Sequence, residues 1–348
     1  MRGDRLNLKR VERMAQDLYR LRVPLPNNPL KELNSYVVMG DGRALLVDLG
    51  FDMVECHDAL KAGLAELGLS FSDVDVFITH GHPDHCGCIA RVAEPGMRVL
   101  AGFPSSSFLQ QILCQEFKGF KRWMADEDTY LQYRRELAPL APGERAELIR
   151  ELFDWGMGEI VTPSLDLPFT VLSEGDTVAV GPWAFSVISV QGHSPNHLCL
   201  YDRKRRILIA GDQVLPSITP NLAEFSIGEN VLSKYLASFG KLETLDVDLV
   251  LPAHREPYSG LNVRIAQLRE HHARRSGEVA QAVRDGNATA VQVAKSVSWR
   301  NPIRNWNDWP IKQKFFAVGE TLAHLSYLES KGVVRVSTDG GRVRFFAV

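Results

Sequence analysis

The sequence predicts an α+β protein of two domains. Its 348 residues are more than one small core normally organises, and about 150 residues per domain gives an expectation of two. Short runs rich in β-branched residues alternate with helical patterns, whereas a long middle stretch and the last quarter are mainly helical. The composition, 45% hydrophobic and 24% charged, is typical of a globular chain and excludes a disordered or fibrous protein.

The first hundred residues predict strands and helices in alternation. Residues 36–39 and 44–49 are apolar runs joined by a Gly-Asp-Gly turn, which favours a β-hairpin. The helical pattern that follows ends at Gly68, a residue that tolerates the left-handed conformation at a helix C-terminus. Residues 74–79 are a β-branched run typical of a buried strand, and this run leads directly into a cluster of histidines.

The middle of the chain predicts a helical insertion at residues 103–168, because strand-like runs are absent from it. Strands then resume around one further helix. We expect strands at residues 169–172, 178–180, 184–190, 197–202, 206–210 and 249–251, and the helix at residues 232–245.

The last quarter predicts a separate domain, which divides the chain into residues 1–261 and 262–348. Three helical segments followed by a hairpin are typical of a winged helix. The expected elements are helices at residues 265–284, 289–297 and 315–330 and strands at residues 333–337 and 343–348. This domain is basic, with 14 Lys and Arg against 7 Asp and Glu, although the whole chain has a net charge of -2.

Nothing in the sequence predicts a membrane partner. It contains no run of about 18 uncharged apolar residues, and its first residues are charged throughout, unlike a secretory signal. Five scattered cysteines favour reduced thiols over a disulfide framework. We therefore expect a cytoplasmic protein.

Histidine and aspartate residues gather at the ends of predicted strands. The segment HGHPDH at residues 80–85 lies where a buried strand gives way to a helix. His193, Asp212 and His254 lie at the ends of later strands. Imidazole and carboxylate groups are preferred ligands of zinc, manganese and iron, so the pattern predicts a metal site.

The order of these motifs resembles the metallo-β-lactamase superfamily of hydrolases. HxHxDH is followed by GHSPNH, AGD and PAH at successive strand ends, and the resemblance covers about residues 30–258. It implies an αββα sandwich, two mixed sheets face to face with helices outside, and a dinuclear metal centre at one edge. The last quarter is similar to the winged-helix domain that follows this sandwich in a subset of these hydrolases.

The resemblance also implies a set of ligands and two cations, zinc in the first place and manganese or iron as alternatives. It assigns His80, His82 and His193 to one cation, Asp84, His85 and His254 to the other, and Asp212 to both. Asp48 resembles the family's first motif and is expected to orient an imidazole by accepting its N–H. Asp84 and Asp48 are the predicted catalytic residues.

The expected function is hydrolysis of an ester, thioester or lactone of a small-molecule acyl substrate by a metal-bound hydroxide. Two neighbouring divalent cations lower the pKa of bound water enough to supply this nucleophile. The predicted substrate contacts are His197, Asn196, Trp123 and Tyr130. The aromatic residues of the insertion either grip the acyl group or serve only for packing, including packing between two chains of a homodimer.

Two departures from the family pattern leave alternatives open. Cys86 and Cys88 stand where relatives commonly have glycines, and we expect packing roles, with soft metal ligation or redox sensing as the alternative. Asn196 stands where glycine is common, as a turn residue or a substrate contact.

The main alternative function is that of a metal-dependent endoribonuclease or phosphodiesterase, because a branch of relatives joins this sandwich to this C-terminal domain. Residues 1–261 are acidic, with 26 Lys and Arg against 35 Asp and Glu, which argues against nucleic acid as a partner. An iron-dependent oxygenase would use only the first metal site, so the complete second ligand set argues against it.

Overall fold

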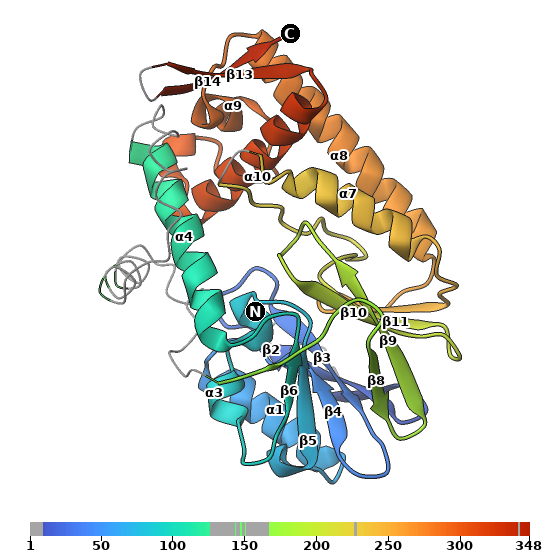
Figure 1. Cartoon of the computed structure of the whole chain (residues 1–348). Helices are drawn as coiled ribbons and strands as arrows, with labels where there is room; N and C mark the ends of the chain where they lie inside the picture. The colour runs from blue at the N-terminus through green and yellow to red at the C-terminus, as the bar shows by residue number, and fades with distance from the viewer. Residues whose placement is uncertain are drawn as a thin grey trace, which may run out of the picture.

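The computed structural model describes residues 10–125, 143, 147, 150, 167–225, 228–339 and 342–348. Two β-sheets lie face to face, helices cover their outer faces, and a mainly helical C-terminal part lies beyond one end of the sandwich (Figure 1).

The first sheet has seven strands in chain order, as the structure describes it. They are β1 (Val11–Ala15), β2 (Leu18–Pro24), β3 (Glu32–Val38), β4 (Ala44–Val47), β5 (Val74–Ile78), β6 (Val99–Ala101) and β7 (Thr170–Val171). Pairs from β1 to β4 are antiparallel and pairs from β4 to β7 are parallel, so the sheet is mixed. The predicted hairpin is β3 and β4.

The second sheet has five strands in the order β12-β11-β10-β9-β8. They are β8 (Thr177–Val180), β9 (Trp183–Val190), β10 (His197–Asp202), β11 (Ile207–Gly211) and β12 (Leu249–Pro252). Only β11 and β12 pair in parallel among these described strands.

Alternation along the strands builds the layers, because successive side chains point to opposite faces of a sheet. In β4, Leu45 and Val47 pack between the two sheets with Phe185 of β9. Leu46 points the other way and packs with Leu60 of the outer helix α1 (Val54–Glu66). Both faces of the strand are therefore buried, as an αββα sandwich requires.

Four helices complete the outer layers of the sandwich. The first sheet is also covered by the short helices α2 (Pro83–Cys86) and α3 (Ile89–Val92). The second is covered by α7 (Val231–Leu242) and α8 (Leu261–Arg284), which lie side by side in Figure 1.

The C-terminal part contains the predicted three helices and hairpin in the predicted order. After α8 come α9 (Ala290–Ser296), α10 (Ile311–Ser330), β13 (Val334–Asp339) and β14 (Arg342–Ala347). Among the described residues, short 3-10 helices lie at Phe71–Asp73, before β5 in the sandwich, and at Trp306–Asp308 in the C-terminal part. The classification as a winged helix stays a prediction. Helix α8 links the two parts, because Ile265 packs on the sandwich while Val279 packs in the C-terminal core.

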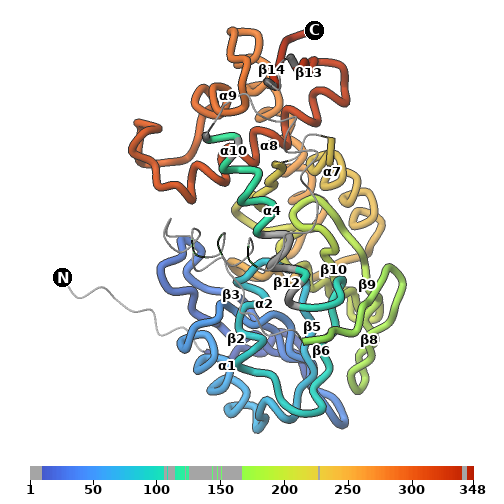
Figure 2. The backbone as a smooth tube through the Cα atoms, turned by 60° about the vertical axis from the view of Figure 1, so that its left-hand side comes forward, coloured from blue at the N-terminus to red at the C-terminus, as the bar shows by residue number. Residues whose placement is uncertain are grey.

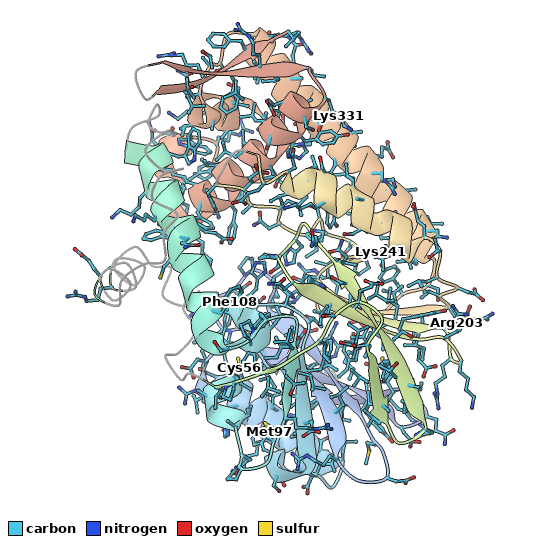
Figure 3. All side chains as sticks on the ribbon, in the orientation of Figure 1. Cys56, Met97, Phe108, Arg203, Lys241 and Lys331 are labelled. Carbon is cyan, nitrogen blue, oxygen red and sulfur yellow. The ribbon has the colours of Figure 1, made fainter. Side chains whose placement is uncertain are left out.

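The longest described part of the predicted insertion is one helix, α4 (Ser106–Ala125). It runs from the first sheet, where Phe108 lies, to the C-terminal helices (Figures 2 and 3). Its Phe120 and Trp123 are buried with Phe225 and with Phe315 of α10. These aromatic side chains therefore hold the C-terminal part in place, which is the packing role that the sequence left open.

Strands β1 and β2 were not predicted, because charged residues interrupt their apolar pattern. Arg20 in β2 is fully buried and its guanidinium pairs with Glu12 of β1 and with Glu256. A buried charge needs such partners, and the sequence gives no local sign of them.

No helix in the described ranges is both long enough and apolar enough to cross a bilayer.

Candidate metal centre

Strand ends and one short helix bring the predicted ligands to one edge of the sandwich. Parallel neighbours end at the same edge of a sheet, and β9, β11 and β12 run in one direction. The ligands and Asp48 follow these elements directly: Asp48 follows β4, His80 and His82 follow β5, Asp84 and His85 lie in α2, His193 follows β9, Asp212 follows β11, and His254 follows β12.

The ligand atoms form three close groups. Two of them contain the residues that the resemblance assigns to one cation each, and the third, made of His80, His85 and Asp212, joins these two. His80, His82 and His193 each place a ring nitrogen within 4.8 Å of the others. Asp84, His85 and His254 form the second group within the same limit. Nε2 of His80 lies 3.0 Å from Nδ1 of His82 and 3.2 Å from Nε2 of His193.

Asp212 lies between the two groups. Its Oδ2 is 3.5 Å from Nε2 of His193 and 3.6 Å from Nε2 of His85. Its Oδ1 is 3.6 Å from Nε2 of His254. The carboxylate therefore reaches both groups, as expected of a bridging ligand.

Hydrogen bonds fix which nitrogen of three rings faces the centre. Nδ1 of His193 donates to the carbonyl of Asn221 at 2.8 Å, and Nδ1 of His254 donates to the carbonyl of Glu32 at 2.9 Å. Nδ1 of His85 donates to Oδ2 of Asp48 at 2.8 Å. A neutral imidazole carries one N–H, so in its neutral form each ring turns the lone pair of Nε2 toward the centre.

Three buried polar atoms at the centre make no hydrogen bond with the described protein. Among the described residues, Nε2 of His85, Nε2 of His254 and Oδ1 of Asp212 are buried with no hydrogen bond. Buried polar atoms are normally satisfied, so these three need another group. Imidazole lone pairs and a carboxylate oxygen suit a divalent cation, and the donor set therefore fits the metals that the sequence predicts.

The electrostatics of the first group favour neutral rings. Burial lowers the pKa of His80, His82 and His193, and the neighbouring imidazoles lower it further for His80 and His82. The pKa of His82 falls to about 3. These rings therefore keep their lone pairs at neutral pH.

The second group holds the negative charge. Burial raises the pKa of Asp84 and Asp212, but the imidazoles of His85 and His254 lower it more, so both carboxylates are ionised. Burial lowers the pKa of both imidazoles, but nearby carboxylates raise it above its ordinary value. These are Asp48, Asp212 and Asp84 for His85, and Asp212 and Asp84 for His254. Positive charge is therefore favoured at this position, as a proton or as a cation.

Asp48 supports the ligand cluster by accepting hydrogen bonds from Thr79 and His85. Its Oδ1 accepts the backbone N–H of Thr79 at 2.9 Å, and its Oδ2 accepts the Thr79 hydroxyl and His85 Nδ1, both at 2.8 Å. Its carboxylate thus holds the imidazole of His85 in place. Thr79 was missed, although its position immediately before HxHxDH is a usable signal.

His197 was predicted to contact substrate, and the structure corrects this. The ring is fully buried, stacks on His80 with centroids 4.7 Å apart, and accepts the backbone N–H of Asp212 through Nε2 at 3.2 Å. Gly211 lies against this ring with φ +52°, and a Cβ there would meet the ring at 2.8 Å. His197 positions two ligands instead.

Asn196 has a left-handed backbone, which explains why it stands where glycine is common in the family. Its φ is +59°, a conformation that asparagine tolerates better than most residues and that glycine adopts freely. It also lines the cavity described below, so the structure is compatible with a turn residue and with a substrate contact.

The cysteines beside the cluster are packing residues. All five cysteines are buried, and none forms a disulfide with a described residue. Cys86 Sγ lies 3.3 Å from the carbonyl of His82, and burial raises the pKa of Cys88 to about 12. Within the described residues, neither thiol belongs to a group of ligand atoms.

A cavity of about 720 Å³ opens onto both ligand groups, and we call it the central cavity. Its metal-facing wall includes His82, Asp84, His193 and Asp212. The other walls come from the loop at residues 28–30, from α4, from residues 215–225 and from α10. The apolar side chains among them include Leu30, Phe51, Leu215, Ile218, Phe225, Phe315 and Phe316.

Trp123, a predicted aromatic contact from the insertion, is not among the residues that line this cavity. Trp123 is 3% exposed, and its Nε1 donates to the carbonyl of Phe225 at 3.2 Å, which corrects its predicted role as a substrate contact. Tyr130 lies outside the described residues. Helix α4 instead contributes Gln115 and Glu116. Burial, together with the nearby Glu229, raises the pKa of Glu116 to about 8, so this carboxyl is mostly protonated at neutral pH.

Comparison of the sequence with known proteins gives matches over nearly the whole chain. Residues 31–99 and 119–254 match the metallo-beta-lactamase superfamily. The probable metallo-hydrolase YqjP of Bacillus subtilis is 26% identical over 341 residues, which cover 95% of this chain and 98% of that protein. The acyl-coenzyme A thioesterase MBLAC2 of Gallus gallus is 28% identical over 228 residues, or 64% of this chain and 72% of that protein.

Two solved structures are similar from end to end. A beta-lactamase domain protein from Burkholderia ambifaria has a TM-score of 0.72 at 28% identity, covering 97% of this chain and 95% of that one. A metallo-beta-lactamase family protein from Thermus thermophilus has a TM-score of 0.70 at 28% identity, covering 97% and 100%. The similarity to both structures therefore extends through the C-terminal part.

Proposed function

The chain belongs to the metallo-beta-lactamase superfamily of metal-dependent hydrolases, and from this we propose that it hydrolyses a carboxylic thioester, ester or lactone. One observation carries the proposal: apolar side chains line the same central cavity as carboxylates and imidazoles of the metal centre. Such a space suits an acyl group whose carbonyl lies against the ligands.

The proposed ligands are those that the structure brings together. His80, His82 and His193 would hold one divalent cation, Asp84, His85 and His254 the other, and Asp212 lies where it can bind both. Bound divalent cations supply Lewis acidity, which polarises a carbonyl and lowers the pKa of water. We place zinc first, with manganese and iron as alternatives.

The protein's own groups then bind and orient the reactants. Asp84 faces the cavity as an ionised carboxylate, so it can accept a hydrogen bond from an incoming water. Leu215 and, on α10, Phe315 and Phe316 line the same cavity, and their apolar side chains suit contact with an acyl group. The C-terminal part thus completes the cavity.

Among carboxylic substrates we place thioesters first. Three relatives that carry the name acyl-coenzyme A thioesterase MBLAC2 are 27–28% identical over 43–64% of this chain. A thioester of a small acyl carrier would present an apolar acyl group and a compact reacting carbonyl, and the central cavity has room for both.

The scarcity of basic side chains in the central cavity argues against a phosphodiester polymer. Among its described lining residues, only Lys234 and Lys312 are lysines or arginines. Nucleic acid normally needs a basic track beside the reacting groups.

A hydrolysis panel tests the proposal. The full chain loaded with zinc is assayed with p-nitrophenyl esters, acyl thioesters, lactones and single-stranded RNA, with and without EDTA. We expect cleavage of a carboxylic substrate that EDTA abolishes and that zinc or manganese restores. His82→Ala should reduce it to background, whereas His57→Ala, outside the site, should not. Metal-dependent cleavage of RNA alone would contradict the proposal.

A further inference from the structure

A second cavity, of about 670 Å³, lies beside the central one in the C-terminal part, and we call it the basic cavity. It is enclosed by α8, α10, residues 217–219 and the segment after α9. Its charged and aromatic lining residues are Arg264, His271, Arg274, Arg275, Glu278, Trp299, Arg300, Trp309, Phe316 and Glu320.

The basic cavity has an excess of positive charge. Its two glutamates both pair with Arg275, with Nη1 3.1 Å from Glu278 and Nε 3.5 Å from Glu320. Within the described chain, no carboxylate lies within ion-pairing distance of Arg264, Arg274 or Arg300. Positive charge is therefore left for an anion to neutralise.

Arg264 and Arg300 differ in the hydrogen bonds that they make with the protein. Arg264 donates to the carbonyls of Leu215 at 2.6 Å and Ile218 at 2.8 Å, which fixes its guanidinium in place without neutralising it. Arg300 makes no hydrogen bond with the described residues, so its donors are free for a ligand.

The same positive charges affect the pKa of His271. Burial and the four surrounding guanidiniums, first that of Arg275, lower the pKa of His271 to about 4. The ring is neutral at physiological pH and adds a polar group without adding charge. The cavity therefore combines concentrated positive potential with a hydrogen-bonding wall.

Two tryptophans give the basic cavity an aromatic wall. Nε1 of Trp299 donates to the carbonyl of Ala294 and Nε1 of Trp309 to that of Ile303, both at 2.7 Å. These bonds fix the rings, whose planes meet at 80° with centroids 6.5 Å apart. Fixed indoles beside guanidiniums suit a ligand that carries both a planar base and phosphates.

The basic and central cavities share part of their walls. Ile218, Thr219, Phe316 and Glu320 line both. A ligand with its carbonyl at the metal centre could therefore extend past Phe316 into the basic cavity.

We propose that the basic cavity binds the phosphorylated nucleotide end of a thioester substrate whose acyl end occupies the central cavity. This inference rests on the proposed hydrolysis of thioesters. It assigns Arg274 and Arg300 to the phosphates and the tryptophan wall to the base. An RNA strand is the less suitable occupant, because the arginines are gathered in one cavity with two glutamates instead of along a track.

Calorimetry tests the cavity independently of catalysis. Adenosine 3′,5′-bisphosphate is titrated into the zinc-loaded full chain, into the double variant Arg274→Ala/Arg300→Ala and into Arg284→Ala. Arg284 lies on the same helix as Arg274 but outside the basic cavity, so it is the matched charge control. We expect binding by wild type and control, and affinity at least about tenfold weaker in the double variant, since two charge-assisted contacts are lost.

Kinetics then connects the cavity to the substrate. The ratio of kcat/KM for a coenzyme A thioester to that for the S-acyl-N-acetylcysteamine thioester, which lacks the nucleotide, should fall about tenfold in the double variant. Arg300→Gln, which breaks no contact with the described residues, should shift the ratio in the same direction.

Three results separate the two proposals. If wild type does not bind the bisphosphate, or if the double variant binds it equally well, the basic cavity is not a nucleotide site. If the bisphosphate binds as expected but neither thioester is cleaved, the proposed hydrolysis fails while the nucleotide site stands. If single-stranded RNA displaces the bisphosphate and is cleaved, the site belongs to nucleic acid and the thioester proposal is overturned.

Discussion

Each of three buried histidines at the metal centre uses one ring nitrogen for a hydrogen bond and turns the other toward the centre. His193 and His254 donate to backbone carbonyls, and His85 donates to the carboxylate of Asp48. The order of motifs in the sequence predicts the ligands themselves. It does not predict the carbonyl partners, because any residue type can supply a backbone oxygen at those positions.

Asp48→Asn tests the support of one ligand. The amide keeps the size of the side chain but removes a carboxylate oxygen that accepts from both Thr79 and His85. We expect the affinity for the second cation to fall about 10- to 100-fold, which is usual when a partner of a metal-binding histidine is lost. Competition with a fluorescent chelator measures it.

The control for this measurement is Asp58→Asn, which changes an exposed carboxylate away from the cluster. It should bind both cations as wild type does. An Asp48→Asn protein that is folded by circular dichroism and keeps wild-type affinity would show that Asp48 does not support His85.

Helices α8 and α10 meet through buried histidines as well as through apolar side chains. His272 is 2% exposed and His324 is fully buried. Nδ1 of His324 lies 2.9 Å from the hydroxyl of Ser276, and Nε2 lies 3.5 Å from Nδ1 of His272. Burial, with the neighbouring His271 and Arg275, lowers the pKa of His272 to about 3.

This interface should make folding sensitive to acid. The folded pKa of His272 lies below the unfolded value of about 6.5, so between these values only the unfolded chain binds the proton. Stability is therefore lost as the pH falls below about 6.5, by about 2 kcal/mol for this residue at pH 5. The free energy of unfolding, measured with urea at pH 7 and at pH 5, should therefore fall less between these two pH values in His272→Gln than in wild type.

His57→Gln, which removes a histidine outside this interface, is the control and should lose as much stability as wild type. Equal losses in His272→Gln and wild type would mean that His272 is not held neutral in the folded protein.

Element prediction from the sequence succeeded where the apolar pattern is regular and failed where a buried charge interrupts it. The hairpin of β3 and β4, the strand β5 and the three C-terminal helices lie close to their expected positions. Strand β2 was missed because Arg20 occupies a buried position, and its partner Glu256 is distant in the sequence. Local patterns do not carry such long-range compensation.

At the scale of the whole molecule, the sandwich supplies the predicted metal ligands and the C-terminal part supplies part of the walls of both cavities. Phe316 and Glu320 of α10 line both cavities, and the aromatic residues of α4 anchor α10 in place. The order of the motifs resembles that of the metallo-β-lactamase superfamily, and this resemblance predicts the four layers of the sandwich. It does not predict either cavity, because their walls join residues that are far apart in the sequence.

Metal stoichiometry tests most directly the claim that seven side chains hold a pair of cations. Protein purified without chelator, equilibrated with zinc and freed of excess metal is analysed by inductively coupled plasma mass spectrometry. The wild type and His57→Ala should contain about two ions per chain, and His254→Ala about one, because it loses a ligand of one cation only. A wild type that holds no more than one ion, or a folded His254→Ala that keeps two, would contradict the dinuclear centre.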